Sequence, residues 1–201
     1  MRIQVKSGQL AQVRDGVQVF AAIEGERRPD RLLPASSGRD RALGQLVAGA
    51  GFRGAANETL LLPRGNQWVA VVGLGKAKDL SLEKVRQFAG TAVKLLRARR
   101  FTRLALPVVG DRAFGSPSAV AQALTEGALL GLYRYDKLKR LPKHEQGKRI
   151  DSITLVVERA GVADVDRQAI GREPGADPPA GAGALPFRHG LDDPASPEFI
   201  D

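Results

Sequence analysis

The residues that come nearest to a chemical site by type and spacing lie at the end of the apolar run Trp68-Val-Ala-Val-Val-Gly-Leu-Gly-Lys76. Glycines let backbone amides approach an anion, and a lysine adds positive charge, so Gly73, Gly75 and Lys76 are candidates for phosphate binding. A dinucleotide fingerprint needs glycine where this sequence has Lys78, and a phosphate loop needs Ser or Thr after its Gly-Lys pair, where this sequence has alanine. A purely structural glycine turn is the competing interpretation.

A second candidate is a basic segment with two tyrosines at its start, Tyr133 and Tyr135. A cluster of cations beside aromatic rings can grip the phosphate backbone of DNA. The alternative is a solvated helix end and loop, and the segment also carries Asp136 and Glu145. The basic residues are Arg134, Lys137, Lys139, Arg140, Lys143, Lys148 and Arg149.

Metal and nucleophile chemistry find little support. The sequence has no cysteine, which excludes disulfides and thiolate metal sites. His144 and His189 stand apart from each other and from carboxylates at ligand spacing. The serines fall at expected helix caps or in loops, without a nucleophile-elbow motif. The sequence therefore predicts no catalytic and no metal-binding residue.

Composition sets the outer limits. A chain of 201 residues with 43% hydrophobic content can form one sizeable domain, and its formal charge of +9 can attract nucleic acid or simply keep the surface solvated. The N-terminus has no apolar signal region, and no stretch approaches the roughly 20 apolar residues of a membrane span. We expect a cytoplasmic protein without a membrane partner.

The elements that would position the glycine turn centre on the valine-rich run. Its lack of a polar face predicts a strand covered on both sides, in the middle of a sheet, and residues 58–74 should form a hairpin. Residues 2–6 and 17–23 are predicted as neighbouring strands joined by the turn Asp15-Gly16. Residues 24–39 read as a loop, and a short helix follows around residues 43–47.

Two longer helices are predicted further along the chain. The first covers residues 81–99 and leads through a right-handed crossover to a strand at 102–109, expected beside the valine-rich strand. The second starts at Ser116-Pro117 and runs out to residue 140, and its glycines Gly127 and Gly131 predict very close packing on that face. A last strand spans 150–157, which completes a mixed sheet with helices on both faces.

Residues 171–201 have a different character from the rest. They are rich in proline and glycine and poor in bulky apolar side chains, so the sequence predicts a mostly disordered tail after a domain of residues 1–170.

Two stretches resemble the N-terminal domain of the leucyl (cytosol) aminopeptidases. The first is Val71-Val-Gly-Leu-Gly-Lys76 followed by Leu80-Ser-Leu-Glu-Lys-Val-Arg86, a long helix and Leu104-Ala-Leu-Pro107. The second, Thr125-Glu-Gly-Ala-Leu-Leu-Gly-Leu-Tyr-Arg-Tyr-Asp-Lys137, is similar to that domain's Glu-Gly-Ala helix with its aromatic and basic end. The two motifs occur in the family's order, and the likeness spans residues 1–170.

The resemblance implies a macro-domain-like α/β fold, a three-layer αβα sandwich around a mixed, mainly parallel sheet. It also implies that the complete enzyme is a hexameric peptidase with two divalent ions, zinc or manganese. In this family the metal ligands and catalytic residues belong to the C-terminal domain, in motifs such as Asn-Thr-Asp-Ala-Glu-Gly-Arg, which this sequence does not contain. No catalytic residue and no cofactor are therefore expected on this chain.

Two functions follow as expectations. The first is a non-catalytic N-terminal domain, without the catalytic half, that organises oligomers or access to substrate and meets further copies of itself or a separate catalytic domain. The alternative is a free-standing macro-like module that binds a nucleotide, an ADP-ribose-like ligand or DNA, and it rests on fold analogy.

Overall fold

The computed structural model describes residues 1–25, 41–108, 114–133 and 149–157. The predicted tail of residues 171–201 lies outside this part of the chain, as do most of the predicted loop at 24–39 and the predicted continuation of the second long helix beyond Tyr133. Within the described part, no helix has the length and apolar content to cross a membrane.

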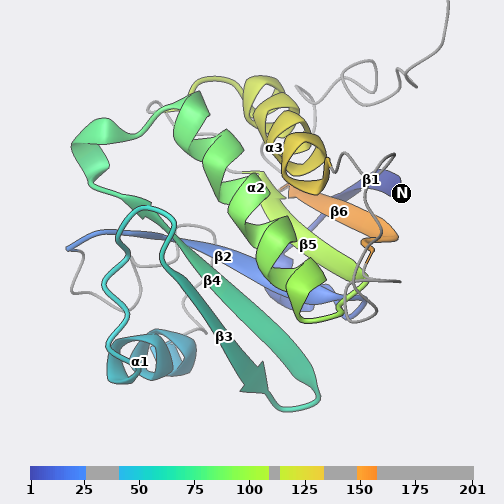
Figure 1. Ribbon diagram of the computed structural model, residues 1–201. Coiled ribbons are helices and arrows are strands. Elements are labelled where there is room, and N and C mark those ends of the chain that lie inside the picture. The colour runs from blue at the N-terminus through green and yellow to red at the C-terminus, as the bar shows by residue number, and fades with distance from the viewer. Residues whose placement is uncertain (26–40, 109–113, 134–148, 158–201) are drawn as a thin grey trace, which may run out of the picture. The chain divides into compact units, whose positions relative to one another are not determined.

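One six-stranded sheet forms the centre of the fold, with the strand order β1-β6-β5-β2-β4-β3 (Figure 1). Five strands run parallel, and only β3 is antiparallel to its neighbour. The sheet is therefore mixed and mainly parallel, as predicted. Its strands are β1 (Arg2–Ser7), β2 (Val17–Ile23), β3 (Thr59–Arg64), β4 (Gln67–Gly75), β5 (Arg103–Val108) and β6 (Ser152–Val157).

The hairpin of β3 and β4 is confirmed, but two predicted neighbours are wrong. β1 and β2 are separated by β6 and β5, and they run parallel, so Asp15-Gly16 cannot join them as a hairpin turn. β5 lies beside β2 and not beside β4. As a result β4 is an internal strand with a neighbour on each side, one place from the edge instead of at the middle.

Three α-helices and two short 3-10 helices complete the described fold: α1 (Arg41–Gly49), α2 (Leu82–Ala98), α3 (Pro117–Leu132), η1 (Leu10–Gln12) and η2 (Ala77–Asp79). The hydroxyls of Ser81 and Ser116 accept hydrogen bonds from Lys84 N and Ala119 N, which satisfies free amides at the starts of α2 and α3. The prediction that α3 runs on to residue 140 is wrong. The helix ends at Leu132, because the backbone of Tyr133 leaves the helical conformation (φ −58°, ψ 129°).

The helices cover both faces of the sheet, as the three-layer fold requires. α2 and α3 lie side by side over one face, where β4 contributes Ala70, Val72 and Leu74 to their core (Figure 1). On the other face Val69 and Val71 of β4 pack in a second core with side chains of α1. The valine-rich strand is therefore buried on both sides, and this prediction is confirmed.

Candidate interaction surface

α2 and α3 touch through three glycines. A Cβ atom on Gly127 would overlap the carbonyl oxygen of Arg86, and one on Gly131 would lie 2.7 Å from the Cα of Gly90. The two helix backbones therefore meet directly, with no side chain between them. The prediction of close packing at Gly127 and Gly131 is confirmed, and Gly90 is the partner that receives them.

An open groove of about 360 Å³ runs over this contact. Gly90, Gly127 and Gly131 line its floor, because glycine leaves backbone where other residues would raise side chains. Thr91 is another lining residue, and its hydroxyl donates a 2.9 Å hydrogen bond to the side-chain oxygen of Asn57, which lies on the connection before β3.

One end of the groove carries a network of paired charges. Arg86 Nε of α2 donates to Glu126 Oε2 of α3 at 2.6 Å, and Arg86 Nη1 lies 3.7 Å from Glu83 Oε2. The hydrogen bond from Arg86, joined by one from Gln122, holds the pKa of the Glu126 carboxyl below its usual range. Arg86 and Glu126 are each about one-third exposed, with side-chain exposures of 34% and 37%, so solvent screens the pair and limits what it adds to stability.

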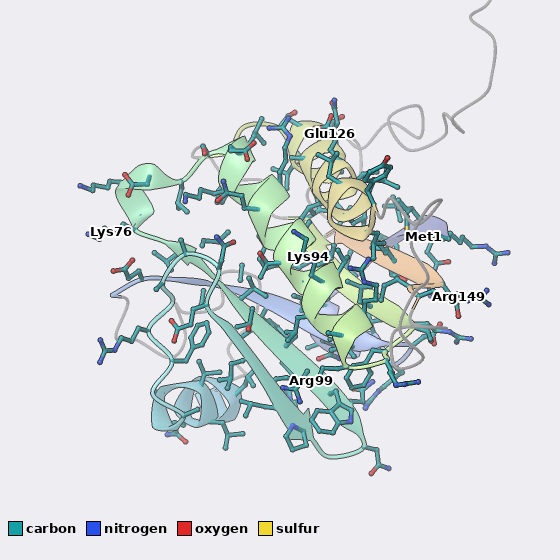
Figure 2. All side chains as sticks on the ribbon, viewed as in Figure 1. Met1, Lys76, Lys94, Arg99, Glu126 and Arg149 are labelled. Carbon is teal, nitrogen blue, oxygen red and sulfur yellow. The ribbon has the colours of Figure 1, made fainter. Side chains whose placement is uncertain are left out.

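Lys94 of α2 and Leu130 of α3 also line the groove. Lys94 is exposed and has no partner among the described residues (Figure 2). Leu129, Leu130 and Tyr133 at the C-terminal end of α3 are 50%, 72% and 72% exposed, and Leu130 is the one of the three that lines the groove. We call this area, from Arg86 and Glu126 across the glycine floor to Lys94 and Leu130, the α2–α3 surface.

Behind Leu130, the end of α3 is fixed to α2. Arg97 Nη1 donates to the carbonyl oxygen of Leu132 at 3.2 Å and so satisfies one of the free carbonyls at the helix end. Arg97 therefore has a local structural role at the α2–α3 contact.

The predicted anion site at Gly73, Gly75 and Lys76 has a different geometry from a phosphate cradle. The amides of Gly73 and Gly75 donate to backbone oxygens of Glu58 and Gly54, at 2.8 and 3.0 Å, and are directed at these partners. Lys76 is exposed at the end of β4 (Figure 2). The phosphate-binding prediction thus has only the Lys76 side chain available among its three residues.

Most of the predicted DNA-binding segment cannot be compared with the structure. Arg134, Lys137, Lys139, Arg140, Lys143 and Lys148 lie outside the described residues. Arg149 is described, is 79% exposed, and pairs through Nε with Asp151 Oδ1 at 2.8 Å. The prediction for the segment therefore stays a prediction.

The described residues do not fit the two-ion centre that the family resemblance implies for the complete enzyme. No group of three or more His, Cys, Asp or Glu side chains within residues 1–25, 41–108, 114–133 and 149–157 could hold a metal ion. Glu83 and Glu126 both pair with Arg86.

Sequence reasoning missed Gly90 and the Arg86–Glu126 pair. The signal for Gly90 was present, because it interrupts the buried stripe of the predicted helix in the same way as Gly127 and Gly131 interrupt theirs. The ion pair joins residues 40 positions apart, and nothing in the sequence specifies that α2 and α3 are neighbours.

The comparisons with known proteins agree with this fold. Residues 22–142 match the model of the cytosol aminopeptidase family, N-terminal domain. The probable cytosol aminopeptidase of Roseiflexus castenholzii is 32% identical over 177 residues, which cover 85% of this chain and 33% of that protein. The probable cytosol aminopeptidase of a Geobacter species is 34% identical over 163 residues, covering 78% of this chain and 32% of that protein.

A solved structure shows the same fold. A lysine-to-glutamate mutant of tomato leucine aminopeptidase superposes with a TM-score of 0.58 at 15% identity, over 78% of this chain and 32% of the tomato chain. The chain spans about a third of the length of the curated relatives that it matches. By the family match over residues 22–142, this chain belongs to the cytosol aminopeptidase family, and the part of the family that it matches is the N-terminal domain.

Proposed function

We propose that this chain supplies the non-catalytic N-terminal domain of a leucyl aminopeptidase-type metallopeptidase of the cytoplasm. Its role in this proposal is to organise the oligomer or the access of substrate to a catalytic domain. The proposal is supported by the family match, by the names of the relatives, and by the third of their length that the chain covers.

The observation that carries an assembly role is the α2–α3 surface. Leu130 exposes apolar area at a groove whose floor is bare backbone, Leu129 and Tyr133 are exposed on the same helix end, and exposed apolar surface of this kind marks contact sites. A glycine floor lets a partner's side chains come close to both helices. Lys94 at one end, and the Arg86–Glu126 pair at the other, give such a partner polar groups to meet at the rim.

The non-catalytic part of the proposal is tested by an activity assay. The purified chain is incubated with a chromogenic leucine substrate and either Mn²⁺ or Zn²⁺, and no hydrolysis above the metal-only control is expected. Metal-dependent turnover by the chain would contradict this part of the proposal.

The assembly role is tested by sedimentation velocity over a range of protein concentrations. Leu130→Gln should weaken self-association, because it places a polar group at the centre of the exposed apolar patch. Leu46→Gln is the matched control, since Leu46 is 53% exposed on α1 and lies outside the α2–α3 surface.

Two results would contradict the assembly role. If Leu46→Gln and Leu130→Gln have the same effect, the α2–α3 surface is not the contact. If the chain is a monomer at every concentration and also fails to bind a separately produced catalytic domain of a family relative, no assembly role remains.

A further inference from the structure

Arginines from separate parts of the sequence lie along one border of the sheet. This border is formed by the N-terminal ends of the parallel strands, and it is not an edge strand. The strand register aligns Arg2 of β1 and Arg103 of β5 with Ser152 of β6, and Arg64 ends β3 at the turn into β4. We call this set the arginine edge: Arg2, Arg14, Arg64, Arg99, Arg100, Arg103 and Arg149.

The remaining members reach the same edge from the connections. Arg14 precedes β2, and the neighbouring carbonyl of Val13 accepts hydrogen bonds from Gln18 and from Gln67 at the start of β4. Arg99 and Arg100 follow the C-terminus of α2, which runs back across the sheet to the start of β5 (Figure 2). Arg149 directly precedes β6.

Only two carboxylates among the described residues balance this edge. Asp15 pairs with Arg103 at 2.6 Å, and Asp151 pairs with Arg149. The Arg103 guanidinium donates this hydrogen bond to the Asp15 carboxylate, which raises the pKa of Arg103 above its usual value, so the guanidinium stays charged. The side chains of Arg2, Arg14 and Arg99 are exposed and have no partner in the described part of the chain.

At the opposite border, where the parallel strands end, positive and negative side chains balance each other more closely. Its described charged residues include Arg53, Lys76 and Lys78 as well as Glu24, Glu58 and Asp79. The positive charge of the described domain is therefore concentrated at one edge, and such a one-sided distribution attracts a polyanion to that edge.

An open aromatic pair lies within the arginine edge. Trp68, at the start of β4, is 43% exposed, and its ring centroid lies 5.8 Å from that of Phe101, which follows Arg100. Guanidinium groups bind phosphates, and an exposed indole face can stack on a base. A base is free to stack in this way only where it is unpaired.

We propose that the arginine edge binds single-stranded nucleic acid, with its phosphates on the arginines and a base stacked on Trp68. Six strands spaced about 4.8 Å apart give an edge about 24 Å wide, enough for several consecutive phosphates. This activity is separate from the proposed non-catalytic role in an aminopeptidase and does not rest on it. It also uses residues other than those of the predicted basic segment, apart from Arg149.

The direct test is a titration of the full chain with a labelled oligothymidylate of about 16 nucleotides, at about 50 mM salt, followed by fluorescence anisotropy. Trp68 is the only tryptophan of the chain, so its emission reports on the arginine edge itself. Binding should quench Trp68 over the same concentration range as the anisotropy change, and Trp68→Leu should weaken binding about fivefold or more.

A charge-matched pair of variants identifies the site. Combined Arg2→Gln, Arg14→Gln and Arg99→Gln should weaken binding at least about tenfold and lower the slope of log affinity against log salt by about 2, since each phosphate contact contributes about 0.7. Combined Arg53→Gln, Lys76→Gln and Lys78→Gln removes the same charge from the opposite edge, and should change the affinity by less than about twofold. Circular dichroism checks that each variant is folded.

Four results would overturn the proposal. They are absence of binding at low salt, equal weakening by the two triple variants, unchanged Trp68 emission at saturation, and tighter binding of a duplex of the same length. Equal weakening would show attraction by net charge alone, and a preference for duplex would remove the role of base stacking.

Discussion

Glycine brings backbone against backbone at two places in this domain, and the two contacts differ. In the α2–α3 contact, Gly90, Gly127 and Gly131 keep helical backbone angles and serve only by lacking a side chain. Where the loop before β3 meets β4, a Cβ on Gly73 would overlap the carbonyl oxygen of Ala55, and Gly75 has a φ of +85°. The loop contact thus needs both the missing side chain and an unusual backbone angle.

The loop contact also uses the backbone amides, which the helix contact does not. Asn57 N donates to Gly73 O at 2.9 Å, and Gly75 N donates to Gly54 O at 3.0 Å. Glu58 holds the same loop by accepting from the amides of Arg53 and Ala55. The difference teaches that a glycine-rich sequence resembling a phosphate loop can arise from packing of the chain on itself.

The largest effect is expected for the helix contact. Gly127→Ala should lower the free energy of unfolding by about 3 kcal/mol, because its Cβ meets the rigid backbone of Arg86 and the whole of α2 must move. Urea unfolding measures the loss. Gly49→Ala is the control, since the added methyl group at the end of α1 has no neighbour within 4 Å, and it should change stability by less than about 0.5 kcal/mol. Equal losses in the two variants would refute the backbone contact.

A smaller and more local effect is expected for the loop contact. Gly73→Ala should cost about 2 kcal/mol, because a loop can shift away from β4 more easily than one helix can shift from another. Hydrogen exchange should then accelerate at the amides of Asn57 and Gly75, whose bonds join the loop to β4. Uniform acceleration over the whole domain would show instead that this contact is as central as the helix contact.

The fold was predictable where a single stretch of sequence carries the signal. The apolar stripe with Ser81 before it specified α2, and Ser116-Pro117 specified the start of α3. Strand order was not predictable in the same way. β1 and β2 are close in sequence, yet two strands lie between them. The connections between parallel strands are long enough to reach several positions in the sheet, so their lengths do not specify which strands are neighbours.

The candidate surface was predictable in part for a similar reason. The cost of a glycine inside a helix pointed to Gly127 and Gly131. The arginine edge could not be found from the sequence, because Arg2, Arg64 and Arg103 come together only through the register of separate strands. Arg134 and the basic residues after it were easier to notice because they are neighbours in sequence, and those up to Lys148 lie outside the described residues.

A third substitution tests the α2 side of the helix contact separately from the α3 side. A Cβ on Gly90 would lie 3.2 Å from the carbonyl oxygen of Gly127, which is tight but tolerable after a small shift. Alanine also favours the helix by about 1 kcal/mol over glycine, so Gly90→Ala should change the free energy of unfolding by less than about 1 kcal/mol. Thermal unfolding of Gly90→Ala and Gly127→Ala in parallel measures the ratio of their effects on stability. A loss as large as that of Gly127→Ala would mean that the contact tolerates no added atom on either helix.

The smallest effect is expected for the ion pair between Arg86 of α2 and Glu126 of α3, beside the glycine contact. Arg86 lowers the pKa of Glu126 from its ordinary value of 4.5, so the carboxylate stabilises the fold above that pH. Its contribution is lost as the pH falls through the lower pKa of the folded state. Glu126→Gln should therefore cost less than about 1 kcal/mol at neutral pH, and its difference from the wild type should vanish in acid.

Urea unfolding at several pH values measures this difference, with Glu83→Gln as the matched control. Glu83 lies 3.7 Å from the same guanidinium and its side chain is 63% exposed, so its substitution should cost less than that of Glu126. A Glu126→Gln difference that stays constant into acid would mean that the side chain acts through its shape and not its charge. The α2–α3 contact would then depend on the glycines alone. The ion pair would no longer be a difference between this contact and the loop contact at β4.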